Sequence, residues 1–279
     1  LARPPAGVKI RLLLLTRDDN PTRWVDEAAQ AGASALFGRQ HLTPAPPLDE
    51  DAAWTVFATA RAKLREAGFP APSPVNQSDF IDWLGRHELL RLALFVTALA
   101  LHSVLAPDQP ALTLTGREVV AALVARERRR LREISMARGM AECGLERLSA
   151  LAAVRGGLDE PTCRRLAAPA LDLGLGGEAG LMDRLDKAGM LRGGRLPAPE
   201  PDMVAAALLA EVVAARPDPA PEWLWAALDG DVKEALARLD RLIWDAEFIL
   251  KYEQPRLTGV LARTVAGKPA RAAAVEPYV

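Results

Sequence analysis

Few cysteines and no long apolar run limit the kinds of protein that this chain can be. Its 279 residues include two cysteines, Cys143 and Cys163, which are too few for a disulfide scaffold and suit the reduced thiols of a cytoplasmic protein. The longest apolar stretch, residues 92–101, is about half of the ~20 residues that a membrane-spanning helix needs. The N-terminus shows no signal peptide. The sequence therefore predicts a cytoplasmic protein without a membrane span.

The charge balance and the scarcity of metal-binding side chains exclude further classes. The formal net charge is −1, with 50% hydrophobic and 25% charged residues, as in a soluble globular protein that has no global attraction to nucleic acid or membranes. The three histidines, His41, His87 and His102, lie far apart in the sequence and no two share a helix face through i,i+4 spacing. No Gly-x-Ser-x-Gly sequence occurs. We therefore expect neither a metal site nor a serine-hydrolase elbow.

The first informative pattern is the apolar run from Val8 to Arg17, which contains four consecutive leucines. Such a run, closed by polar residues, is typical of a central parallel strand buried on both faces. A parallel strand needs neighbouring strands and covering helices, yet only seven residues precede this one and the chain begins with leucine. We therefore expect the sheet to be incomplete, with the chain being the later part of a longer protein.

Most of the remaining sequence has helical periodicity, and little β pattern follows a proline-rich connector at 69–74. We expect a loose tail at 266–279. The expected fold is mainly α, with a small α/β remnant at the N-terminus followed by helices. These helices are expected at 48–66, 77–84, 87–105, 115–139, 142–154, 160–168, 178–189, 201–215, 219–228, 231–250 and 255–266.

Several short motifs, taken in order over about residues 8–215, resemble the signal-transduction P-loop ATPases with numerous domains, the STAND class. Residues 12–24, LLLLTRDDNPTRW, resemble a late strand of the nucleotide-binding core and the turn after it. Gly85-Arg86-His87 and the leucines that follow stand where the class opens a helical lid, with His87-Glu88 in place of a proline. Residues 115–130 resemble the helix that leads into a winged-helix domain, 191–196 resemble its wing, and 199–208 resemble the entry to its closing helix.

The resemblance implies four parts and a regulatory role. The parts are the end of an incomplete α/β nucleotide-binding core at 1–70, a helical lid at 71–140, a winged-helix-like domain at 141–216, and a C-terminal helical segment at 217–279. In the class, ADP holds the winged helix against the core, and exchange for ATP releases it to oligomerise and signal. The chain would then be the regulatory portion of a bacterial signalling switch.

Three residues are implied to contact ATP or ADP. Arg17 ends the buried strand, where α/β sheets bind ligands, and would sense the phosphates; its alternative is to be the first solvated residue after a strand. Gly85 and His87 would lie at the adenine side. The phosphate-binding loop Gly-x-x-x-x-Gly-Lys-Ser/Thr is absent from the sequence. Hydrolysis of ATP would therefore require an upstream half, and no metal site is expected in this chain.

The tryptophans of the last helices leave another function open. Trp223, Trp225 and Trp244 recur with leucines at helical spacing, which is typical of core packing, of a partner surface, or of the first unit of a helical repeat. The main alternative function is therefore a non-catalytic interaction scaffold that binds other domains or subunits, including a second copy of the chain, through its C-terminal helices.

A winged helix could also act as a DNA-binding regulator. Its candidate reading helix, Glu178–Ala188, carries Arg184 and Lys187 against three acidic residues, so its charge opposes attraction to phosphates. Arg192 and Arg195 on the expected wing favour the contact. The densest basic cluster, RERRRLR at 126–132, is interleaved with glutamate and is typical of a solvated helix face with local ion pairs. Nucleic acid is therefore the least favoured partner.

Overall fold

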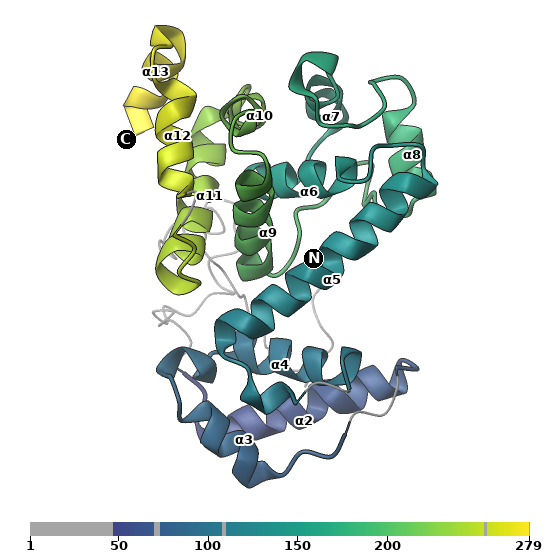
Figure 1. Ribbon diagram of the computed structural model, residues 1–279, viewed down its shortest axis with the longest axis vertical. Coiled ribbons are helices and arrows are strands. Elements are labelled where there is room, and N and C mark those ends of the chain that lie inside the picture. Colours follow the sequence, from purple (N-terminus) through teal and green to yellow (C-terminus); the bar gives the residue numbers. More distant parts are fainter. Residues whose placement is uncertain (1–46, 70–72, 108–109, 254–255, 279) are drawn as a thin grey trace, which may run out of the picture. The chain divides into compact units, whose positions relative to one another are not determined.

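The computed structural model describes residues 47–69, 73–107, 110–253 and 256–278 (Figure 1). Over these residues the fold is mainly α, which confirms the expected class, and the extended pairing found there consists of two isolated bridges. The expected strand at 8–17 and the residue Arg17 lie outside the described part. The helices are α2 Glu50–Glu66, α3 Gln77–Leu84, α4 Ala93–Leu105, α5 Gly116–Ala137, α6 Gly144–Arg155, α7 Glu160–Leu166, α8 Leu181–Lys187, α9 Asp202–Ala215, α10 Ala220–Leu228, α11 Val232–Ile243, α12 Leu257–Val265 and α13 Pro269–Val275.

Residues 47–279 form one compact unit. The divisions at 70, 140 and 216 that the sequence suggested remain predictions.

Local capping signals determine where several helices begin and end. The Asp49 carboxylate accepts a hydrogen bond from the Ala52 N–H at 2.7 Å and begins α2. Thr115 and Glu118 form a capping box at the start of α5, in which each side chain accepts from the other residue's backbone N–H. Gly156, with φ of +68°, ends α6 in the left-handed region. These signals explain why most expected ends were right to within a few residues.

The first described helices enclose an aromatic cluster. α2 packs along α4 and against α3. The rings of Phe57 and Phe80 stack at 4.8 Å, and Trp54 and Trp83 lie beside them. The indole N–H of Trp83 donates to the Leu114 carbonyl at 2.7 Å, so this cluster also fixes the chain that enters α5.

Helix α5 joins this group to the later helices, because it contacts α4 as well as α6 and α9 (Figure 1). Gly116 begins α5 against the Phe95 ring, where a Cβ atom would lie 2.8 Å from the ring. Helix α9 is buried along most of its length and also contacts α6 and α11. It is therefore the centre of the core in this part of the chain.

Between α6 and α9 the chain pairs with itself at two points. The backbone groups of Leu158 and Leu196 exchange hydrogen bonds of 2.7 and 2.9 Å, so the residues before α7 and after α8 lie side by side. A second bridge joins Arg192 to Arg195 across two glycines with positive φ. The resulting order is helix, bridged residue, two helices and a tight hairpin.

The structure corrects three expectations about helices. The helix expected at 87–105 is divided at Leu92, whose ψ of 135° separates a 3₁₀ turn, Glu88–Arg91, from α4. The helix expected at 231–250 changes from α11 to a π-helical segment, Trp244–Ile249. The tail was expected to be loose, but α13 is ordered against α10 because Arg271 and Lys268 form ion pairs with Glu222.

Candidate functional site

A hollow of about 360 Å³ adjoins the loop after α3. It is lined by Pro47, Leu84, Gly85, His87 and Arg91. The structure thus brings together two of the three residues expected to contact a nucleotide, and it adds Arg91, which the sequence did not single out for this role. The third residue, Arg17, lies outside the described part of the chain.

Gly85 and His87 contribute to the hollow in different ways. Gly85 caps α3 with φ of −73° and ψ of −13°, an ordinary helical conformation, and a Cβ atom there would meet the Ile81 carbonyl oxygen at 3.5 Å, an ordinary contact. The backbone therefore does not require glycine at this position. His87 is exposed, and its carbonyl accepts from the Leu90 N–H at 3.0 Å, which turns the chain into the 3₁₀ segment.

Arg91 provides the positive charge of the hollow. Its guanidinium lies 3.6 Å from the Glu50 carboxylate, and both side chains remain partly exposed, so this pair is weak. Its carbonyl accepts from the Leu48 N–H at 2.9 Å, which holds the start of α2 against the 3₁₀ segment. A partly exposed guanidinium that lines a hollow suits an anionic ligand group.

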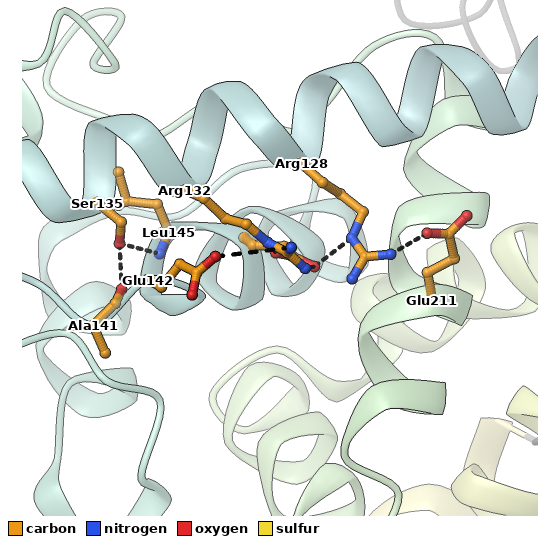
Figure 2. A network of polar contacts seen from close by, with 8 residues as sticks. Arg128, Arg132, Ser135, Ala141, Glu142, Leu145 and Glu211 are labelled. Carbon is orange, nitrogen blue, oxygen red and sulfur yellow. Dashed lines mark hydrogen bonds and ion pairs between the residues drawn. The ribbon is translucent and has the colours of Figure 1, made fainter.

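A second group of residues, here called the polar junction, joins α5 to α6 and α9 (Figure 2). It consists of Arg128, Arg132, Glu146 and Glu211. The Glu146 carboxylate, whose side chain is 2% exposed, accepts from the Arg128 Nε at 2.5 Å and from the Arg132 Nε at 2.6 Å. Arg128 also forms an ion pair with Glu211. A carboxylate this deeply buried requires such partners, so both arginines are held in place.

The polar junction corrects the interpretation of the basic cluster at 126–132 as a solvated face. Arg130 does pair locally with Glu127, at 2.6 Å, but Arg128 and Arg132 reach across to other helices. The hydrogen bond that Arg132 donates to the Glu146 carboxylate raises the pKa of its guanidinium above the usual value. The signal in the sequence was an acidic residue at a buried stretch of each helix: Glu146 follows Leu145 in α6, and Glu211 lies between Ala210 and Val212 in α9.

The contacts of Glu211 extend the polar junction toward the C-terminal helices. The Tyr252 hydroxyl donates to Glu211 at 3.1 Å, and the Arg117 guanidinium lies 5.3 Å from the centre of the Tyr252 ring. Burial, followed by the charge of Glu211, raises the pKa of the Tyr252 phenol. One network therefore links α5, α6, α9 and the residues after the π-helical segment.

A further hollow of about 490 Å³ lies along α5 next to the polar junction. Arg128, Arg129 and Arg132 line it together with Glu133 and Glu142. Since Arg128 and Arg132 are already paired with carboxylates, the charges there nearly cancel. This hollow therefore does not form an anion site, and the polar junction is structural.

The cations of the candidate DNA-reading helix are engaged within the fold. Arg184 on α8 donates to the carbonyls of Leu175, Gly177 and Ala179 and so closes the glycine-rich loop before the helix. Lys187 forms an ion pair with Asp183 at 2.8 Å. These contacts leave α8 little free positive charge for phosphates, although Arg192 and Arg195 are exposed.

The described residues also lack two features that other functions would require. No group of three or more histidine, cysteine, aspartate or glutamate side chains there could hold a metal ion. In the same part of the chain no helix is both long enough and apolar enough to cross a membrane. The buried thiol of Cys163 has its pKa raised to about 12 by desolvation, which makes it a poor nucleophile.

Comparisons of the chain with protein-family models, with curated proteins and with solved structures found no match.

Proposed function

We propose that this chain is the regulatory portion of a bacterial, cytoplasmic STAND-like nucleotide switch, with a helical lid, a winged-helix-like domain and a C-terminal helical segment. The observation that carries the proposal is the order of elements from Gly144 to Leu196. A helix, a bridged residue, two helices and a tight hairpin follow one another. The Leu158–Leu196 bridge pairs a residue before α7 with the residue that follows the hairpin. This order is the one expected of a winged helix, and it coincides with the segment that resembles one in sequence.

The hollow beside Gly85 supports the lid part of the proposal. In this proposal the adenine ring lies in the hollow near Gly85 and His87, and Arg91 faces the phosphates. The resemblance in sequence implies that Arg17 would contact the phosphates as well. ATP and ADP would bind differently because the arginines contact the phosphate that distinguishes them, and such a difference is what shifts a conformational equilibrium.

The chain by itself is expected to bind nucleotide weakly. It has no phosphate-binding loop, so the backbone N–H groups that hold phosphates in P-loop proteins would have to come from another segment or subunit. A dissociation constant on the order of 1 mM would stabilise the fold by only about 0.4 kcal/mol at an equal ligand concentration. Protection of individual amides near the hollow is therefore a better measure of binding than a shift in the melting temperature of the whole chain.

Hydrogen exchange with and without 5 mM ADP tests the proposal on the complete chain. We expect slower exchange at residues 84–91 and loss of that protection in His87→Ala and Arg91→Ala. Arg192→Ala is the matched control, because it removes an exposed charge from the hairpin and should leave the protection unchanged. The proposal fails if ADP protects no amide in 84–91, or if His87→Ala and Arg91→Ala are protected as strongly as the wild type.

A second function, that of a protein-interaction scaffold, is favoured by one observation. Trp244 and Phe248 stack on each other at 4.6 Å, yet they are 54% and 52% exposed. Large exposed aromatic side chains are enriched where proteins bind one another. Sedimentation velocity at rising concentration, with Trp244→Ser as the variant, tests whether the partner is a second copy. Self-association that the variant abolishes would support this function over the first.

A further inference from the structure

The C-terminal helices contain two hairpins, and three of their four helix boundaries differ by one constant offset; only the ends of the second helices, Ile243 and Val275, do not. Helix α10 covers 220–228 and α12 covers 257–265, so both of their ends are displaced by 37 residues. Helix α11 begins at Val232 and α13 begins at Pro269, again 37 residues later. An unrelated pair of hairpins has no reason to agree at all three boundaries.

The turns of the two hairpins have the same backbone geometry. Gly230 and Gly267 occupy equivalent positions, with φ of +91° and +67°, conformations that favour glycine. The residues before them, Asp229 and Ala266, have φ and ψ of −59° and 134° and of −58° and 128°. The agreement therefore extends to individual dihedral angles.

The hydrogen bonds of the turns are also equivalent. Asp229 donates to Trp225 at 2.9 Å, and Ala266 donates to Ala262 at 3.0 Å. The next bonds, from Asp231 to Leu228 and from Lys268 to Val265, are 3.2 and 3.1 Å long. In each pair, donor and acceptor are both displaced by 37 residues.

The side chains buried on the first helix of each hairpin follow the same positions. Ala220, Trp223 and Ala227 of α10 are buried, and so are their counterparts on α12, Leu257, Val260 and Thr264. The helices pack as stacked repeats do: α10 against α12, α11 against α13, and each pair within its own hairpin (Figure 1). Sequence offset, turn geometry and packing therefore agree.

We propose that residues 220–241 and 257–278 are two stacked copies of one helical hairpin, repeated at an offset of 37 residues, which form an α-solenoid segment of the kind that presents stacked helices to protein partners. Glu222 fixes the stack, since it joins the first hairpin to Lys268 and Arg271 of the second. The Arg271 guanidinium also lies 5.0 Å from the centre of the Trp225 ring. The proposal does not depend on nucleotide binding.

Insertion of an extra unit tests the repeat directly. A copy of residues 220–256 is placed between Arg256 and Leu257, and the copy carries Asp231→Lys and Glu234→Arg. These are the positions equivalent to Lys268 and Arg271, so Glu222 of the first unit meets the same two cations as in the natural chain. The control insertion is a glycine- and serine-rich segment of equal length at the same place.

We expect the inserted copy to add helical circular dichroism and to leave the amides of α12 as protected from hydrogen exchange as in the natural chain. The flexible control should add no helix and should detach α12 and α13, which raises their exchange rates. If the inserted copy behaves like the flexible control, the two hairpins are not copies of one unit and the proposal is wrong.

A measurement on the natural chain tests whether the second hairpin opens as a unit. Glu222→Gln and Gly267→Ala should each raise exchange about five- to tenfold throughout 257–275 and leave α10 unchanged, because nearest neighbours hold a terminal repeat. Gly189→Ala is the matched control, since Gly189 also has positive φ and open space around it but lies outside the hairpins. A rise that spreads equally over α9 to α13, or one confined to the turn, contradicts the proposal.

Discussion

Replacement of Glu146 by glutamine tests whether the polar junction holds α5 to α6 and α9. The substitution keeps the size of the side chain and removes its charge, and it leaves Arg128 and Arg132 facing an amide. In the wild type this carboxylate is 2% exposed, whereas the side chains of Arg128 and Arg132 are 21% and 33% exposed. After the substitution, water can therefore solvate part of each arginine, but it cannot reach the buried amide of the new glutamine.

The expected loss follows from these exposures. Removal of one partner from a fully buried ion pair costs roughly 3–5 kcal/mol. Because Arg128 keeps Glu211 and both arginines reach solvent, we expect Glu146→Gln to lower the free energy of unfolding by about 2–3 kcal/mol. For a chain of this size that corresponds to a fall in Tm of roughly 3–6 °C.

Urea denaturation followed by circular dichroism measures the effect, and Glu127→Gln is the control. Glu127 pairs with Arg130 on the exposed side of the same helix, so its loss should cost about 0.5 kcal/mol or less. Equal midpoints for wild type and Glu146→Gln would refute the reasoning. The same conclusion would follow if the two variants lost stability equally.

Three further outcomes are expected. Burial lowers the pKa of His102, which is 4% exposed, so the unfolded chain binds a proton more readily than the folded chain. The free energy of unfolding should therefore fall as the pH drops below about 6.5. Urea titrations at pH 7.5 and 5.5 measure this difference, and His102→Leu should remove it. Cys163 has its pKa raised to about 12, so a thiol reagent at pH 8 should modify the half-buried Cys143 first and Cys163 only after unfolding, as mass spectrometry would show. Gly116→Ala should lower the free energy of unfolding by about 1–2 kcal/mol because the new methyl group meets the Phe95 ring, and Phe95→Leu should reduce that loss in a double-mutant cycle.

Helix positions were the part of the fold that sequence predicted best. The bounds expected for 77–84 are those of α3, and those expected for 201–215 differ from α9 by one residue. Caps and apolar periodicity are local signals, and they suffice wherever the chain obeys them. At the tail the local signals were present but were not used: α13 begins with Pro269 at its first position and is rich in alanine, and the ion pairs of Glu222 hold it in place.

The candidate site was predictable in part, because part of it depends only on residues that are near one another in the sequence. Gly85 and His87 are two positions apart in the sequence, so the same loop holds both, and the end of α3 determines where that loop begins. The contribution of Arg91 depends on the way the 3₁₀ segment folds back on the start of α2, where Leu48 donates to the Arg91 carbonyl. The polar junction depends on contacts between residues as distant as Arg128 and Glu211. Spacing alone does not reveal such pairs.

The repeat was hidden from sequence because its two copies share so few residue identities. Between 220–241 and 257–278 the identical pairs are Leu224 and Leu261, Gly230 and Gly267, Ala235 and Ala272, and Ala237 and Ala274. What the copies share is a set of physical requirements, namely a small or apolar residue at each buried position and a glycine where φ is positive. Trp223 and Val260 satisfy the same requirement with different volumes, and Glu222 has glycine as its counterpart. The stacked pair is therefore asymmetric, and its ion pairs lie on the face where the first hairpin meets the second, so substitutions of Glu222 should loosen the second hairpin far more than substitutions of Gly259.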